Sequence, residues 1–399
     1  MNKPEKPVRI AEGIYWVGAL NPDMRRFDVI METEFGTSYN SYVVVGADKI
    51  ALIDAVRKGY LSESLALIKQ VIDPSKIDYI VVQHTEPDHS GSIEDLIDLA
   101  PNAKILCTKP ASLNLPFISH RELPITVVKD GDSIDLGGRT LKFLSAPFLH
   151  WPDTMFTYDD KTGSLFTCDA FGCHFAPENV LESLTDEKFK GARRYYYDCI
   201  VAPFAPFVTK AIAHVNELGL NVSAILPSHG PVLDKDPAGA VELYAGWAKE
   251  RERSGGKKVF IGYVTCYGYT QQLAQAFAEE LNARGIATEM ADLADITAEE
   301  ADERIYRSDA LAIGTPTVNS DSLPPIWQAL GHLAVPLVRS RKAAVFGSYG
   351  WSGEAVPSVE RRLNDLGFKV VGTYKTRFRP DEQALKDVRA LAASLAESI

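Results

Sequence analysis

The sequence of 399 residues contains only five cysteines, and no two of them form a Cys-x-x-Cys pair. An odd number of cysteines argues against a disulfide framework, and the missing spacing argues against a thiolate metal site. We therefore expect buried structural thiols at Cys107, Cys168, Cys173, Cys199 and Cys266.

Long apolar runs and an excess of basic residues are also missing. No apolar run approaches the roughly 20 residues that cross a bilayer, so no membrane span is expected. The first nine residues are polar and carry both signs of charge, unlike a secretory signal, which predicts a cytoplasmic location. A formal net charge of -11 argues against nucleic acid as a partner, because binding phosphates needs a basic surface.

The length and composition fit a globular protein of two domains, with 46% hydrophobic and 24% charged residues. Residues 248–258 (AKERERSGGKK) are charged and have no apolar period, as in an interdomain linker. We therefore predict one domain over residues 1–250 and a second over residues 257–399.

The two halves differ in their expected secondary structure, although both are α/β. Residues 41–145 alternate short strand-like runs with helix-like stretches, and residues 136–167 favour hairpins. In the second half, apolar strands at residues 259–264, 310–313 and 343–346 are each followed by a helix-like stretch. That alternation predicts a doubly wound parallel sheet, which binds ligands beyond the carboxyl ends of its strands.

Four possible metal ligands crowd into six residues directly after the expected strand at residues 78–82. Three more stand where we expect the strands 141–149, 165–168 and 224–227 to end. Seven ligands, three of them carboxylates, can hold two metals, and this mixture suits iron or manganese better than zinc alone. The predicted ligands are His84, Glu86, Asp88, His89, His150, Asp169 and His229.

Three loops at expected strand ends of the second half are rich in hydroxyls, glycines and aromatic rings. Amides and hydroxyls at a helix start can hold a phosphate without lysine, and the dinucleotide and P-loop fingerprints are missing. This favours a monophosphate such as that of FMN. The predicted flavin contacts are Thr265, Cys266, Tyr267, Gly268, Tyr269, Thr270, Thr315, Pro316, Thr317, Val318, Asn319, Ser348, Tyr349, Gly350, Trp351, Ser352 and Gly353.

These motifs together resemble the metallo-β-lactamase fold and, more closely, the flavodiiron proteins. The hydrolase motif reads His-x-His-x-Asp-His and binds zinc, whereas this chain has Glu86 at the second histidine. The resemblance implies an αββα sandwich followed by a flavodoxin-like sheet. It also implies that His84, Glu86 and His150 hold one iron, that Asp88, His89 and His229 hold the other, and that Asp169 bridges them.

The resemblance extends to two residues beside the metals. His174 matches a histidine that lies near the metals in the family, where it would guide protons or order the bound gas, although a purely structural role is equally open. Residues 195–197 are three adjacent tyrosines, similar to a family segment that supplies one tyrosine to the site. We choose Tyr196, with Tyr197 as the alternative.

The function implied is the reduction of dioxygen to water, of nitric oxide to nitrous oxide, or of both. An external donor such as a rubredoxin or a reduced deazaflavin coenzyme would supply electrons through FMN. A head-to-tail homodimer, or a dimer of dimers, would bring the flavin of one chain to the irons of another. The alternatives are a zinc hydrolase of the β-lactamase fold and a non-catalytic redox carrier or sensor.

Overall fold

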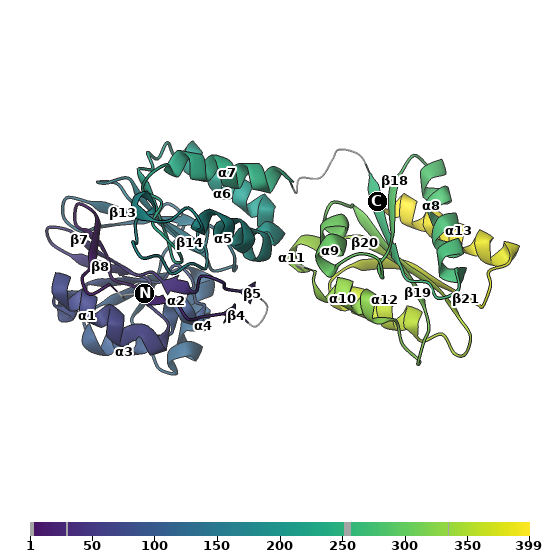
Figure 1. Cartoon of the computed structure of the whole chain (residues 1–399), viewed down its shortest axis with the longest axis horizontal. Coiled ribbons are helices and arrows are strands. Elements are labelled where there is room, and N and C mark those ends of the chain that lie inside the picture. The colour runs from purple at the N-terminus through teal and green to yellow at the C-terminus, as the bar shows by residue number, and fades with distance from the viewer. Residues whose placement is uncertain (1–3, 29–30, 251–256, 334) are drawn as a thin grey trace. The chain divides into compact units, whose positions relative to one another are not determined.

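The computed structural model describes residues 4–28, 31–250, 257–333 and 335–399. The chain forms two compact units, Met1–Glu250 and Arg251–Ile399, and Figure 1 labels their elements.

The first sheet of the first unit has the strand order β1-β2-β7-β8-β9-β10-β11. Strands β8 to β11 run parallel, which requires crossover segments, and the helices α1 (Leu61–Val71), α3 (Ile93–Leu99) and α4 (Lys109–Ser119) lie in the segments that connect them. The strands are β1 (Val8–Ala11), β2 (Ile14–Trp16), β7 (Tyr42–Val45), β8 (Ile50–Ile53), β9 (Tyr79–Val81), β10 (Lys104–Cys107) and β11 (Ile125–Val127).

The second sheet has the order β12-β13-β14-β15-β16, in which β16 runs parallel to β15 and the other neighbours are antiparallel. Two short ribbons, β3 (Ala19–Asn21) with β6 (Thr37–Tyr39) and β4 (Arg26–Phe27) with β5 (Met31–Glu32), complete the unit. The second sheet comprises β12 (Ser133–Asp135), β13 (Thr140–Ser145), β14 (Met155–Asp159), β15 (Ser164–Cys168) and β16 (Ala224–Pro227).

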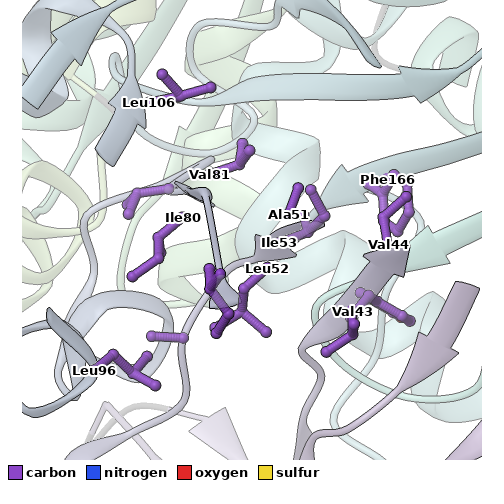
Figure 2. Packing of buried hydrophobic residues seen from close by; sticks show 14 of the residues in the cluster. Val43, Val44, Ala51, Leu52, Ile53, Ile80, Val81, Leu96, Leu106 and Phe166 are labelled. Carbon is purple, nitrogen blue, oxygen red and sulfur yellow. The ribbon is translucent and has the colours of Figure 1, made fainter. Parts of the chain in front are cut away.

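Side chains that alternate along β14 and β15 bury both faces of the second sheet. Met155 and Phe166 belong to the core between the sheets, and Figure 2 shows Phe166 beside Val44 of the first sheet. Phe156 and Leu165, which point the other way, pack beneath the helices α5 (Phe189–Tyr196), α6 (Ala205–Glu217) and α7 (Pro237–Glu250). The result is the αββα sandwich that the sequence predicts.

The helical stretch Phe189–Glu217 joins α5 to α6 through a π-helical turn (Tyr197–Val201) and a 3-10 turn (Ala202–Phe204). By length and composition alone it could cross a membrane, whereas the sequence predicts no membrane span. Its side chains Tyr196, Tyr197 and Val201 are nevertheless part of the core beneath the second sheet.

The second unit is a parallel five-stranded sheet in the order β18-β17-β19-β20-β21. One face packs on α8 (Tyr269–Ala283) and α13 (Glu382–Ser398), and the other on α9 (Ala298–Tyr306), α10 (Pro324–Gly331) and α12 (Ala355–Asp365). A further short helix is α11 (Val335–Val338), and the strands are β17 (Lys258–Tyr263), β18 (Ala287–Asp292), β19 (Ala310–Pro316), β20 (Lys342–Tyr349) and β21 (Lys369–Arg377). This doubly wound order places its ligand crevice beyond the carboxyl ends of β17 and β19.

Two expectations need correction. The expected linker begins inside α7, which continues to Glu250, because Trp247 and Ala248 are buried in the core; residues 251–256 lie outside the described residues. Of the five cysteines, Cys199 and Cys266 are exposed and not buried.

Candidate metal centre and flavin site

Four of the seven predicted ligands lie in residues 84–89, which follow β9. The chain leaves β9 at Val81, one residue earlier than predicted, and Pro87 then opens the one-turn helix α2 (Pro87–Ser90). Proline suits this position because the first amide of a helix has no intrahelical partner. The tight turn keeps all four ligands at one end of the first sheet.

Three later segments supply the other ligands. Asp169 and His229 follow β15 and β16, whose parallel pairing brings their ends together. His150 does not end a strand as expected, because Ser145 already pairs with Met155 and closes the ladder between β13 and β14. It lies instead in the hairpin loop between these strands.

The first ligand group comprises His84, Glu86 and His150. The Nε2 atoms of His84 and His150 lie 3.2 Å and 3.1 Å from Oε2 of Glu86. Both Nε2 atoms lie 3.6 Å from Oδ2 of Asp169. These donor atoms therefore surround one common position.

The second ligand group comprises Asp88, His89 and His229. The Nε2 atoms of His89 and His229 lie 3.2 Å and 3.4 Å from Oδ1 of Asp169. The two carboxylate oxygens of Asp88 lie 3.4 Å from His89 Nε2 and 3.1 Å from His229 Nε2. Asp169 thus turns one oxygen toward each group, which is the arrangement of a bridging carboxylate.

The donor set fits two metal ions. Nitrogen and oxygen ligands at about 2.1 Å from one ion stand roughly 3.0 to 3.4 Å apart in octahedral or tetrahedral geometry, close to the separations in both groups. Among the described residues, both oxygens of Asp88, Nε2 of His89 and Oδ1 of Asp169 are buried without a hydrogen-bond partner. Buried polar atoms without partners are costly, and metal ions would satisfy these four.

The charges of the cluster also favour cations. Burial lowers the pKa of His84, but hydrogen bonds to Asp153 and Glu86 outweigh it and raise the pKa to about 9. Burial also lowers the pKa values of His89 and His229. Nearby carboxylates outweigh burial, so the net effect is a raised pKa for both imidazoles. The carboxylates thus draw protons onto these imidazoles when no metal supplies the positive charge.

A third group of possible ligands, Asp54, His89 and Cys168, is buried behind the second ligand group. Burial and the carboxylates of Asp169 and Asp54 raise the pKa of the Cys168 thiol well above its usual range. Because a thiol binds metal as the thiolate, this group is a poor metal site.

His174 and Tyr196 lie next to the second ligand group. The ring of His174 is 5.0 Å from that of His229 and 4.9 Å from that of Tyr196. Burial lowers the pKa of His174 to about 3, so its imidazole is neutral. Its Nδ1 contacts the hydroxyl of Thr37 at 2.9 Å, and its buried Nε2 has no partner among the described residues.

The three adjacent tyrosines face different surroundings. Tyr195 is 44% exposed, whereas Tyr197 packs its ring 5.0 Å from those of Tyr244 and Trp247. Tyr196 alone of the three packs against His174. His174 and Tyr196 also line a cavity of about 880 Å³, and the ring of His174 lies between this cavity and the ring of His229.

Two carboxylates at the site were missed by the sequence analysis. Burial and the neighbouring carboxylate of Glu86 raise the pKa of Asp28 to about 6. Asp153 binds His84 Nδ1 at 3.0 Å. Asp153 follows His150 by three residues, a spacing that could have drawn attention, whereas nothing in the local sequence marks Asp28.

The predicted flavin residues gather at the carboxyl ends of β17, β19 and β20. Thr315 and Pro316 are the last residues of β19, and Ser348 and Tyr349 the last of β20, so these four belong to strands and not to loops as predicted. Each strand is longer than its apolar run because the ladder between β19 and β20 continues to Pro316. The rest follow the strands, namely Thr265, Cys266, Tyr267, Gly268, Tyr269 and Thr270 after β17, Thr317, Val318 and Asn319 after β19, and Gly350, Trp351, Ser352 and Gly353 after β20.

The first of these segments suits a phosphate. Gly268 is the N-cap of α8 with φ +79°, and no side chain caps the helix, so its first amides are available to an anion. The hydroxyl of Thr265 is buried without a partner among the described residues. Thr270 Oγ1 lies 3.2 Å from Ser348 Oγ, which joins the first segment to the third.

Two aromatic residues suit the flavin ring. Tyr267 and Trp351 are 83% and 82% exposed on the first and third segments, an unusual exposure for such large apolar side chains. Their faces are free to stack on an isoalloxazine, which fits FMN at this edge of the sheet.

Comparison with protein families gives two matches, one for each unit. A family described as "ODP family beta lactamase" matches residues 37–230, and a family described as "Flavodoxin" matches residues 261–390.

Individual relatives match over almost the whole chain. The flavo-diiron protein FprA2 of Clostridium acetobutylicum is 38% identical over 98% of this chain and 99% of its own length. A nitric oxide reductase of Moorella thermoacetica is 38% identical over 92% of each chain. Among solved structures, rubredoxin oxygen:oxidoreductase from Desulfovibrio gigas superposes with a TM-score of 0.66 at 30% identity, covering 98% of both chains.

Proposed function

We propose that this chain, which belongs to the flavodiiron protein family, reduces nitric oxide to nitrous oxide and dioxygen to water in the cytoplasm. As a flavodiiron oxidoreductase it carries FMN and a pair of irons. The observation that carries the proposal is the carboxylate of Asp169, which turns one oxygen to each of two complete ligand groups.

The electron balance is consistent with both gases. Two molecules of nitric oxide take up two electrons and two protons to give nitrous oxide and one water, and dioxygen takes up four electrons and four protons to give two waters. When bound, the irons supply a place for the gas and two electrons, and FMN supplies two more. The two relatives named for a nitric oxide and an oxygen activity support this choice.

The residues of the chain position the gas and control protons. The neutral imidazole of His174, with its unpartnered Nε2, can donate or accept a hydrogen bond toward a molecule beside the second ligand group. Burial raises the pKa of Tyr196 well above its usual range, so its phenol remains protonated. Both side chains are buried, and the low local dielectric strengthens such hydrogen bonds.

The geometry argues against the two alternatives. Glu86 Oε2 lies between the imidazoles of His84 and His150, so a carboxylate replaces the neutral second histidine of the zinc hydrolases. A redox carrier or sensor needs no cavity beside its metals, whereas here a cavity is lined by His174 and Tyr196, whose rings pack next to the ligand His229.

The electron donor and the assembly are part of the same proposal. No nicotinamide fingerprint occurs in the sequence, so we propose an external donor such as a rubredoxin or a reduced deazaflavin coenzyme. All seven metal ligands belong to the first unit and all flavin segments to the second. A head-to-tail homodimer, alone or paired into a tetramer, would place the flavin of one chain at the metals of its partner.

The test is a side-by-side electrode assay of the purified protein with iron and FMN bound, a reduced rubredoxin as donor, and either gas. We expect consumption of both gases, with nitrous oxide formed from nitric oxide. Consumption of one gas only would restrict the proposal to that gas. Consumption of neither, with both cofactors present, would contradict it.

A further inference from the structure

Asp153 is a buried carboxylate that belongs to neither ligand group but contacts the ligand segment of residues 84–89. Its side chain is 1% exposed. Oδ1 lies 3.0 Å from Nδ1 of His84, and Oδ2 accepts hydrogen bonds from the backbone amide and the hydroxyl of Thr85, at 2.9 Å and 2.5 Å. Each oxygen of Asp153 thus contacts a different residue of this segment, Oδ1 contacting His84 and Oδ2 contacting Thr85.

The surroundings hold Asp153 in place. Thr108 donates its hydroxyl to the backbone carbonyl of Asp153 at 2.8 Å. Asn114 Nδ2 donates to the hydroxyl of Thr85 at 3.1 Å, so this hydroxyl is free to give its own proton to Asp153. Because Asp153 stands in the same hairpin loop as His150, its contacts connect two segments that supply the first ligand group.

These contacts determine which nitrogen of His84 can bind metal. A carboxylate accepts hydrogen bonds and does not donate them, so Nδ1 of His84 carries a proton directed at Asp153. The lone pair of a neutral imidazole is then on Nε2, which lies 3.2 Å from Glu86 and faces the first ligand group. A negative partner on one ring nitrogen also makes the other a stronger donor.

The second ligand group lacks an equivalent charge at His229. The Nδ1 atom of His229 donates to the backbone carbonyl of Ser38, which is neutral. His84 and His229 therefore differ in the group that accepts a hydrogen bond from Nδ1, which is a carboxylate at His84 and a neutral carbonyl at His229.

We propose that Asp153 is a positioning residue that fixes the tautomer of His84 and strengthens the binding of the metal held by the first ligand group. The inference rests on the iron pair of the proposed function but not on which gas is reduced.

The test uses the full chain, from which iron has been removed, with Asp153 replaced by Asn. The amide is nearly the same size but lacks the charge, and it places an NH₂ group toward either His84 or Thr85. We expect the affinity for one ferrous ion to fall by about 10- to 100-fold, the usual effect of removing such a partner, while the other affinity and the FMN content stay unchanged. Anaerobic iron titration and Mössbauer spectroscopy with ⁵⁷Fe measure this, and one of two ferrous signals should change.

Asp130→Asn is the matched control, because it makes the same exchange at a surface carboxylate that contacts His214. It should keep both affinities and both ferrous signals. Equal loss of both irons in Asp153→Asn would indicate general disruption of the fold and overturn the proposal, as would wild-type affinity and spectrum. These readouts require no gas reduction, so failure of the proposed activity would be recognised separately.

Discussion

The carboxylate of Asp169 lies next to imidazoles of both ligand groups. Its Oδ2 faces His84 and His150, and its Oδ1 faces His89 and His229. Both oxygens are needed, because each lies next to a different pair of imidazoles. A side chain with one oxygen can serve only one ligand group.

Replacing Asp169 by Asn is therefore expected to lower gas reduction on the order of 100-fold and to reduce the iron content, with FMN still bound. Electrode assays, iron analysis and flavin absorbance measure these effects. Asp130→Asn is the control, because it makes the same exchange at a surface carboxylate that contacts His214. Full activity with two irons in Asp169→Asn would show that Asp169 does not bridge.

At the scale of elements, the start of α8 is the predicted binding place of the flavin phosphate. The helix begins after Gly268, whose positive φ turns the chain without a capping side chain. The hydroxyl of Thr265 is buried without a partner at this turn. A hydrogen bond to a charged group contributes about 1.5 to 3 kcal/mol.

Thr265→Val should accordingly weaken FMN binding by about 10- to 100-fold, measured by quenching of flavin fluorescence as FMN is titrated into the flavin-free chain. Thr288→Val serves as the comparison, since Thr288 is on β18 and contacts Asn282 away from the flavin segments. Equal affinities of both variants and the wild type would exclude Thr265 from phosphate binding.

Local sequence patterns predicted the strands of the second unit more accurately than they predicted strand ends. The apolar runs of β17, β19 and β20 and the turn residues after them predict a parallel sheet with its flavin loops, because these signals depend on neighbours in the sequence. The ends of the strands were less predictable: β13 stops at Ser145 because its partner β14 starts opposite that residue. Pairing between strands, and not the apolar run itself, determines that boundary.

At the scale of the whole molecule, the proposed function requires electrons to pass between two units that carry different cofactors. The first unit, of about 250 residues, and the second, of about 150, have expected radii of gyration of roughly 18 Å and 15 Å. A flavin and a metal centre within one chain could be far apart on this scale, and a head-to-tail dimer would bring them together.

Co-expression of two inactive variants distinguishes these arrangements. One chain carries Asp169→Asn, and the other carries Thr265→Val and Thr270→Val to prevent FMN binding. If half of the dimers are mixed and each has one working pair of cofactors, about one quarter of the wild-type activity should return. No recovery in dimers verified by light scattering would contradict transfer between chains, as would a fully active monomer.

The sequence by itself determined the types of ligand, their places near strand ends and the division into two folds. Residues 84–89 are contiguous, and the resemblance to the flavodiiron proteins links Glu86 to iron chemistry, so no tertiary information was needed for that inference. The segments of the second unit that are rich in hydroxyls and aromatic rings were predicted for the same reason, because each of them is contiguous in the sequence.

Only the tertiary structure decided which of three adjacent tyrosines meets His174, and that Asp153 and Asp28 lie beside the ligands. These contacts join segments far apart in the chain, and they depend on strand pairing and on the rotation of α5 against the second sheet. Neither property is encoded in the few residues around Tyr196, Asp153 or Asp28, because packing against distant side chains determines both.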